Sequence, residues 1–157
     1  MNAAHLHLVV NHLPFAFAFV TLIVMLVGLV SKSTAIKKLS LGLMLLVALS
    51  SAGAYFSGTA AEESQFGPDS PGYEQLERHE DSAKVTWIIG LATGIIGFGG
   101  LFAVRRLHDI PFALMVLPLV LLLVSMYFFV KTANLGGQIK HPETRSDAAT
   151  KFLNPTE

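Results

Sequence analysis

The stretch PFALMVLPLVLLLVSMYFFV, residues 111–130, contains no charged side chain in 20 consecutive positions. A helix rises about 1.5 Å per residue, so about 20 apolar residues cross the roughly 30 Å hydrocarbon core of a bilayer. Three further stretches have similar length and almost no charge. The sequence therefore predicts an all-α fold, a four-transmembrane-helix bundle. The predicted spans are residues 8–30, 39–57, 85–104 and 110–130.

The composition of the whole chain is also typical of an integral membrane protein. Of its 157 residues, 52% are hydrophobic and 14% are charged, whereas charged residues make up about a quarter of a soluble domain. Four spans leave too little sequence for a separate soluble domain, so we expect one integral membrane domain over residues 1–157. Residues 1–13 contain no Lys or Arg, so we expect the first apolar stretch to be a span rather than a cleaved signal peptide.

Net charge and cysteine content argue against several classes of function. Lys and Arg together number 11, as do Asp and Glu, so the net charge is zero and nothing favours a nucleic-acid partner. The chain has no cysteine, which excludes thiolate ligands to zinc or iron–sulfur clusters and covalent attachment of c-type haem. The second, third and fourth spans carry no charged residue at mid-depth, which disfavours a transporter or proton pump.

The charges between the spans predict how the protein is oriented. An even number of spans places both termini on one side of the membrane. The two loops on the other side, residues 31–38 and 105–109, hold five Lys or Arg side chains in 13 residues, whereas the central loop 58–84 is acidic. Short basic loops stay in the cytoplasm. We therefore expect a multi-pass protein of the bacterial inner (cytoplasmic) membrane whose termini and central loop are periplasmic.

Glycines and turn-forming residues predict where helices end and where they touch. The third span is expected to begin early, near Tyr73, because good helix formers follow the Pro- and Gly-rich turn there. Gly136 and Gly137 are expected to end the helix of the fourth span. Gly90 and Gly94 are spaced four residues apart, which favours close contact between helices. The alternative for these two glycines is a slot for a flat cofactor.

Five of the six histidines fall on the predicted periplasmic side, in three separate segments of the chain, so we expect a shared site. In one continuous helix His7 and His12 would lie about 140° apart, so a single flat ligand can hardly use both. We expect His5, and His108 on the opposite side, to be incidental. The five histidines of the cluster are His5, His7, His12, His79 and His141.

Two kinds of ligand suit imidazoles at this position. Haem b needs two histidines from facing helices and an apolar slot, which a membrane bundle provides without any cysteine. A divalent transition metal (zinc, copper or iron) would combine imidazoles with a carboxylate, and Glu62 is the candidate for that ligand. A third interpretation is a structural anchor within a larger complex, whose histidines are polar anchors at the membrane surface.

The stretch HLVVNHLP, residues 7–14, resembles the N-terminal His-Pro-x-x-x-His-Phe-Pro hallmark of a family of uncharacterised bacterial four-helix membrane proteins. Leucine replaces the first proline and the phenylalanine. GTAAEE (58–63), HE (79–80) and LGGQIKH (135–141) are further similarities. Members of that family look like companions or fusions of Rieske and cytochrome proteins, so the resemblance implies electron transfer. It also singles out four of the histidines: His7, His12, His79 and His141.

The leading hypothesis is a b-type haem-binding membrane protein for electron transfer, with its bis-His site near the periplasmic face. His12 and His79 would be the axial ligands of one haem. His7 and His141 would ligate a second haem, or orient the first through hydrogen bonds. The expected partners are membrane lipid and, for electrons, a quinol or a periplasmic cytochrome. We expect an electron carrier or a subunit of a redox complex rather than an enzyme, either as a homo-oligomer or within a larger assembly.

Overall fold

The computed structural model describes residues 2–65 and 72–145, and within these ranges the chain forms helices and no strand. Four of its helical segments are long and apolar enough to cross a membrane, so the prediction of an all-α protein with four spans is confirmed by length and composition. The helices are α1 (Ala3–Val10), α2 (Leu13–Val30), α3 (Thr34–Gln65), α4 (Tyr73–Val104), α5 (Phe112–Lys140) and the short 3₁₀ helix η1 (Pro142–Thr144).

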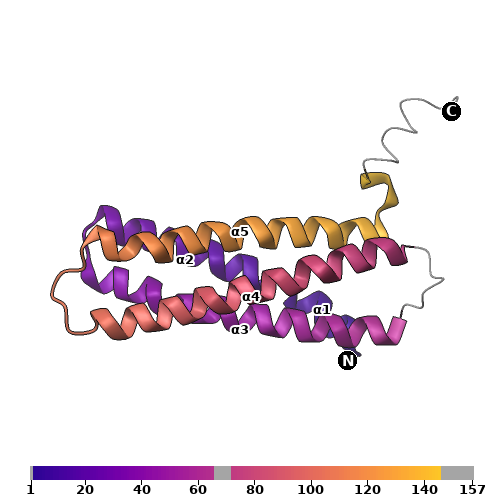
Figure 1. The fold of residues 1–157 in the computed structure, drawn as a ribbon, viewed down its shortest axis with the longest axis horizontal. Coiled ribbons are helices and arrows are strands. Elements are labelled where there is room, and N and C mark those ends of the chain that lie inside the picture. The colour runs from indigo at the N-terminus through magenta and orange to yellow at the C-terminus, as the bar shows by residue number, and fades with distance from the viewer. Residues whose placement is uncertain (1, 66–71, 146–157) are drawn as a thin grey trace, which may run out of the picture.

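The four long helices form an up-and-down bundle (Figure 1). Helix α3 packs between α2 and α4, and α5 packs against α4 and α2, while the short α1 lies on α3. The start of α1 and the end of α5 lie toward one end of the bundle, and the α2–α3 and α4–α5 connections lie at the other (Figure 1). The first end, called here the histidine end, carries His7, His79 and His141.

A break between α1 and α2 interrupts the first span, which extends over Ala3–Val30. Helix α1 ends at Val10, Asn11 and His12 form a turn, and α2 starts at Leu13 with Pro14 in its first turn. Proline has no backbone N–H and is favoured in the first turn of a helix, where that donor has no partner. The angle of about 140° between His7 and His12 assumed an unbroken helix and does not apply across this turn.

The ends of α4 and α5 show one prediction that was right and one that was wrong. Helix α4 begins at Tyr73, as predicted. Helix α5 does not end at Gly136 and Gly137 but continues to Lys140. The stop comes at His141 because the residue before a proline disfavours the helical conformation, and Pro142 follows it. Packing holds Gly136 in the helix, as described below.

The glycine stripe of α4 is a helix contact and not a slot for a cofactor. A Cβ atom added at Gly90, Gly94 or Gly97 would come within 2.3–2.4 Å of side-chain atoms of α3. These three positions are buried and already filled by the neighbouring helix, so the interpretation as helix–helix packing is confirmed. The nearest α3 atoms are Ser51 Oγ, Ala48 Cβ and Met44 Cβ.

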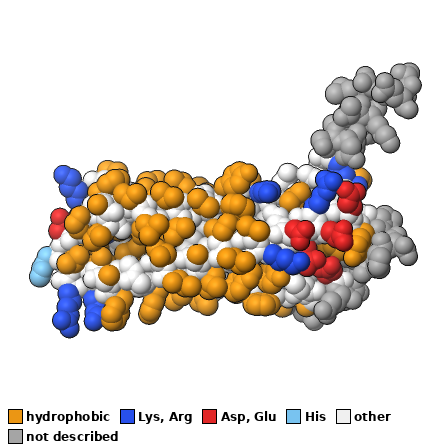
Figure 2. Space-filling view, viewed as in Figure 1, with side chains coloured by type: hydrophobic (Ala, Val, Ile, Leu, Met, Phe, Trp, Pro, Cys, Tyr) orange, Lys and Arg blue, Asp and Glu red, His pale blue; other side chains and the backbone are white. Residues whose placement is uncertain are grey.

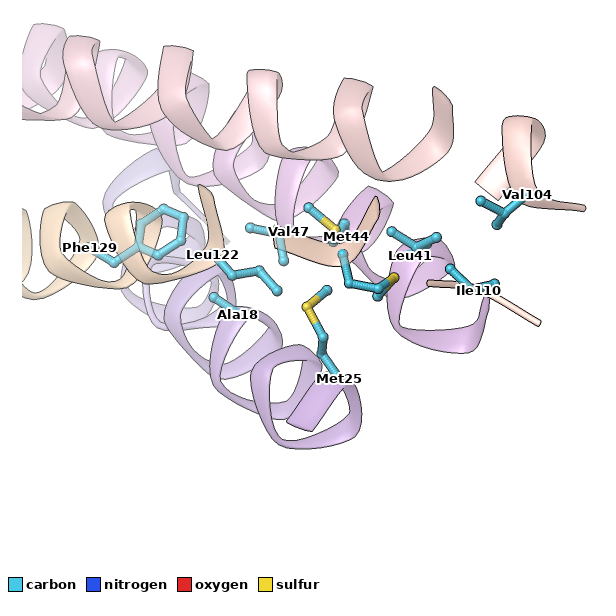
Figure 3. Close-up of a cluster of buried hydrophobic side chains, with 10 residues drawn as sticks. Ala18, Met25, Leu41, Met44, Val47, Val104, Ile110, Leu122 and Phe129 are labelled. Atoms are coloured by element: carbon cyan, nitrogen blue, oxygen red, sulfur yellow. The ribbon is translucent and has the colours of Figure 1, made fainter. Parts of the chain in front are cut away.

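Inside the bundle a narrow core joins α2, α3 and α5, and the outer surface is apolar as well. Met25, Met44 and Leu122 are fully buried and point toward one another (Figure 3). Large apolar side chains are exposed along all the long helices, and they form a broad band between the charged ends (Figure 2). A contiguous apolar surface of this extent needs an apolar surrounding, which a bilayer provides.

At the end opposite the histidines, two lysines of α3 close the connection between α4 and α5. The Lys37 amine, whose residue is only 5% exposed, donates to the Ile110 carbonyl at 2.6 Å. The Lys38 amine donates to the Arg105 and Leu107 carbonyls, each at 3.0 Å. The Arg105 carbonyl caps the C-terminal end of α4, where a helix has no partners of its own and carries partial negative charge, and the Leu107 and Ile110 carbonyls belong to the connection that follows.

Candidate functional site

His7 joins α1 to α3 at the histidine end. Its Nδ1 lies 3.1 Å from the Ala54 carbonyl oxygen and 3.1 Å from Ser57 Oγ. A carbonyl oxygen only accepts hydrogen bonds, so Nδ1 carries the hydrogen and donates it. In the neutral imidazole Nε2 then has a free lone pair. The ring rests on Gly58, where a Cβ atom would lie 3.1 Å from His7 Cε1.

His79 joins α4 to α5 in the same manner. Its Nδ1 lies 2.9 Å from the Thr132 carbonyl oxygen, so this nitrogen is again the donor and Nε2 has the free lone pair. The ring rests on Gly136, where a Cβ atom would lie 3.0 Å from His79 Cε1. Each imidazole therefore donates a hydrogen bond to a carbonyl of the neighbouring helix and rests on the glycine four residues after that carbonyl. Residues four apart share one face of a helix, which makes this a compact seat for the ring.

These seats are the part of the site that the sequence interpretation missed. Gly58 and Gly136 were present in the quoted stretches GTAAEE and LGGQIKH, but only as elements of a resemblance. The acceptors at Ala54 and Thr132 are backbone carbonyls, so no side chain marked them in the sequence. What the sequence did not provide was the pairing of helices, namely α1 with α3 and α4 with α5.

Hydroxyl groups fix the register of α4 against α5 beneath His79. The Thr132 hydroxyl lies 2.7 Å from Ser82 Oγ and 2.7 Å from Thr86 Oγ1, and all three are buried or half-buried. Deeper in the bundle Thr93 and Ser125 pair at 2.8 Å. The first group of bonds determines which carbonyl of α5 stands opposite His79.

The two seated histidines lie at the same end of the bundle, close enough for their charges to interact. His7 is within electrostatic range of His79, and also of His12. Three imidazoles from α1, the α1–α2 turn and α4 therefore gather at the histidine end. Of these three, only His7 and His79 have Nδ1 bonded to a neighbouring helix.

His12 and His141 have different surroundings from those expected of ligands. His12 is exposed in the turn before α2. His141 is exposed beyond α5, and its Nδ1 lies 3.0 Å from the Glu143 carboxylate. The pKa of the Glu143 carboxyl is lowered because its own backbone N–H and the His141 imidazole form hydrogen bonds to it. His141 therefore contacts this surface carboxylate and not the seated pair.

The other residues considered from the sequence do not form a metal-binding group within the described residues. Glu62 is half-buried near the end of α3, and His5 and His108 are exposed. Across the described parts of the chain, no three His, Asp or Glu side chains are grouped closely enough to hold a metal ion. The pairing of imidazoles with a Glu62 carboxylate therefore remains a prediction from the sequence.

Two further residues adjoin the His7 seat along the chain, Asn11 after His7 and Tyr55 after Ala54. The Asn11 side-chain oxygen, one helical turn after His7, is buried and accepts no hydrogen bond from the described residues. A buried acceptor of this kind is stabilised by a donor, and amide oxygen and nitrogen can exchange places by a flip of the side chain. Tyr55, next to Ala54, stacks on Trp87 with ring centroids 6.0 Å apart. Trp87 is the only tryptophan of the chain, so its fluorescence reports on the contact between α3 and α4 at Tyr55.

Comparison of the chain with protein-family models, with curated protein sequences and with solved structures found no match.

Proposed function

We propose that the protein is a b-type cytochrome of the membrane, binding one haem b between His7 and His79. The observation that carries this proposal is the pair of seated imidazoles, each with Nδ1–H bonded to a backbone carbonyl of a neighbouring helix. Histidines that ligate a metal characteristically donate their other ring N–H in this way, which fixes the ring and leaves Nε2 as the ligand atom.

The number and kind of donors favour haem over a free metal ion. Two imidazoles complete the axial positions of a haem iron. A zinc centre needs three or four protein ligands, and no third donor joins His7 and His79 in a metal-like group within the described residues. The proposal differs from the pairing suggested by sequence, because His12 and His141 have no comparable anchor.

The chain's own residues hold and orient the ligands. Ala54 and Thr132 accept the ring hydrogens, and Gly58 and Gly136 let each ring approach the helix backbone. A bound haem iron would supply one-electron chemistry. The redox partner that we propose is a quinol or a periplasmic cytochrome, because His7 and His79 lie near the ends of the apolar helical stretches Ala3–Val30 and Tyr73–Val104. We infer an inner-membrane location with the histidine end periplasmic, since the opposite loops carry the basic residues.

The test is the visible spectrum of protein purified after expression with a full haem supply. A Soret band with the sharp reduced α-band of bis-imidazole haem, at one haem per chain, supports the proposal. His7→Ala and His79→Ala are expected to lose the band, whereas His5→Ala and His108→Ala, which change exposed histidines, are expected to keep it. Binding of added haem to the apoprotein is expected to quench the fluorescence of Trp87.

Three outcomes would contradict the proposal in distinct ways. A protein without a Soret band that contains stoichiometric zinc or copper would be a metal-binding module. A protein without either ligand, whose His7 and His79 variants assemble normally, would be an anchor subunit. Loss of haem in His12→Ala together with retention in His7→Ala would assign the axial position to His12 instead.

A further inference from the structure

A groove of about 450 Å³ runs along the outer face of α4 and α5 at the histidine end. Neither His7 nor His79 lines it. Arg78, Asp81 and Val85 line it from α4, and Phe128, Lys131 and Leu135 line it from α5. The hydroxyl contacts of Thr132 with Ser82 and Thr86 hold the two walls in fixed register.

The groove changes from polar to apolar along its length. Arg78 and Lys131 lie outside the charge-free stretches 85–104 and 110–130, whereas Val85 and Phe128 lie at their ends. Because the helices are antiparallel and Thr132 stands against Ser82 and Thr86, Arg78 and Leu135 lie toward the outer end of the groove, Lys131 lies at mid-length, and Val85 and Phe128 lie toward the inner end. The groove therefore crosses the boundary between water and hydrocarbon with its long axis parallel to that of a lipid molecule.

The charges of the groove leave a cation available. Arg78 pairs with Glu74 at 2.7 Å, and Asp81 lies 3.6 Å from Lys84. The Lys131 amine lies 5.8 Å from the centre of the Phe128 ring, and within the described residues no carboxylate lies within 4.0 Å of it. An amine held over an aromatic ring at the membrane surface, without a counter-charge, is suited to an anionic head group.

We propose that this groove binds an anionic phospholipid. The lipid phosphate is bound by Lys131, Arg78 lies on the head-group side of it, and an acyl chain lies on Val85 and Phe128. The apolar floor distinguishes a lipid from a free phosphate ion, which would use only the two cations. The proposal does not rest on haem binding, because neither seated histidine lines the groove.

The experiment is native mass spectrometry of the detergent-purified protein with phosphatidylglycerol or phosphatidylcholine added at equal concentration. Each cation near a membrane surface contributes about 1 kcal/mol toward an anionic lipid, which corresponds to about five-fold in binding. We expect phosphatidylglycerol to be retained at least five-fold more strongly. Lys131→Gln is expected to lose most of this preference, Lys131→Arg to keep it, and Arg106→Gln at the opposite end to leave it unchanged.

Two results would overturn the proposal. The first is equal retention of the two lipids by the wild-type protein, or the same preference in a Lys131→Gln, Arg78→Gln double variant. The second is displacement of the bound lipid by glycerol phosphate at equal concentration, which would show that a phosphate ion is sufficient. Both cations are exposed, so the double variant is expected to fold, and an unchanged helical circular dichroism spectrum verifies this.

Discussion

At the scale of single residues, the site depends on the absence of a side chain at two positions. Gly58 and Gly136 contribute no side chain, and a ring occupies the space above each of them. A Cβ at 3.0–3.1 Å from the imidazole would push the ring outward by a few tenths of an ångström and weaken its bond to the carbonyl. Each glycine is thus a positioning residue for the histidine that it faces.

We expect Gly58→Ala and Gly136→Ala each to lower haem affinity by about ten-fold, the lower end of the effect of disturbing a ligand's supporting contacts. Gly53→Ala and Gly137→Ala are the matched controls, because an added Cβ there has no atom of a neighbouring segment within 4 Å. Haem titration followed by Trp87 fluorescence measures the effect. Equal affinities for the four variants would mean that the glycines do not position the rings.

A second prediction at this scale concerns the buried Lys37. Replacing it by methionine removes the donor to the Ile110 carbonyl and leaves this buried acceptor unsatisfied. We expect Lys37→Met to lower the free energy of unfolding by about 1–3 kcal/mol. Arg106→Met, which changes an exposed side chain in the same region, serves as control. Denaturation in detergent micelles compares the two, and equal stabilities would contradict the role given to the lysine.

At the scale of the helices, α4 packs closely against α3 because glycines leave no side chain between the two backbones over two helical turns. Gly90, Gly94 and Gly97 bring the two backbones close together. In lipid there is little hydrophobic drive between helices, so close van der Waals contact over such a stripe is a main source of their association. A single methyl group on the stripe therefore separates the helices.

We expect Gly97→Ala to destabilise the bundle by about 1–3 kcal/mol, as overpacking does in a well-packed core. The added Cβ would lie 2.7 Å from the Leu41 carbonyl oxygen, and this backbone atom cannot move aside easily. Gly99→Ala lies two residues away on the same helix, meets no atom of a neighbouring segment within 4 Å and is the control. Thermal unfolding followed by circular dichroism separates them; a Gly97→Ala protein as stable as Gly99→Ala would exclude close packing at this stripe.

Much of the secondary structure could be predicted because a bilayer requires the spanning segments to be helical. Long apolar stretches without charge must be helical in lipid, which predicted the four spans, and the breaker-free segment after the turn predicted the start of α4 at Tyr73. The end of α5 could not be predicted from Gly136 and Gly137. Whether a glycine ends a helix or lies within it depends on what packs against it, and here that is His79.

The candidate site was predictable only as a group of histidines. Topology alone brought His7, His12 and His79 to one end of the bundle. Which of them is anchored depends on the carbonyl that each ring reaches, and this follows from helix pairing and from the turn at Asn11 and His12. Neither is encoded in the spacing of histidines along the chain.

At the scale of the whole molecule, the two ends differ in charge and in the polar groups that they carry. One end carries the basic connections closed by Lys37 and Lys38, and the other carries the seated histidines and a mixture of acidic and basic side chains (Figure 2). This asymmetry is the basis for the proposed orientation, because basic connections are retained in the cytoplasm.

The absence of cysteine allows a direct test of the orientation. We expect Glu77→Cys, on an exposed position of α4 at the histidine end, to react with a membrane-impermeant maleimide in intact spheroplasts. Ser31→Cys, exposed at the opposite end, is expected to react only after the membrane is opened. Labelling of Ser31→Cys alone in intact spheroplasts would reverse the orientation and place the proposed haem on the cytoplasmic side.

The hydroxyl pairs between α4 and α5 have a consequence for how the protein is made. These hydroxyl pairs join two consecutive helices: Thr93 bonds to Ser125, and Thr132 bonds to Ser82 and Thr86. The hydroxyl groups of α4 lose hydrogen bonds to water during membrane insertion, and α5, the next helix to be synthesised, provides their new partners. The second half of the chain thus has the means to close as a hairpin by itself. We expect docking onto the first half to follow, and to bring His79 to His7 only after this hairpin has formed.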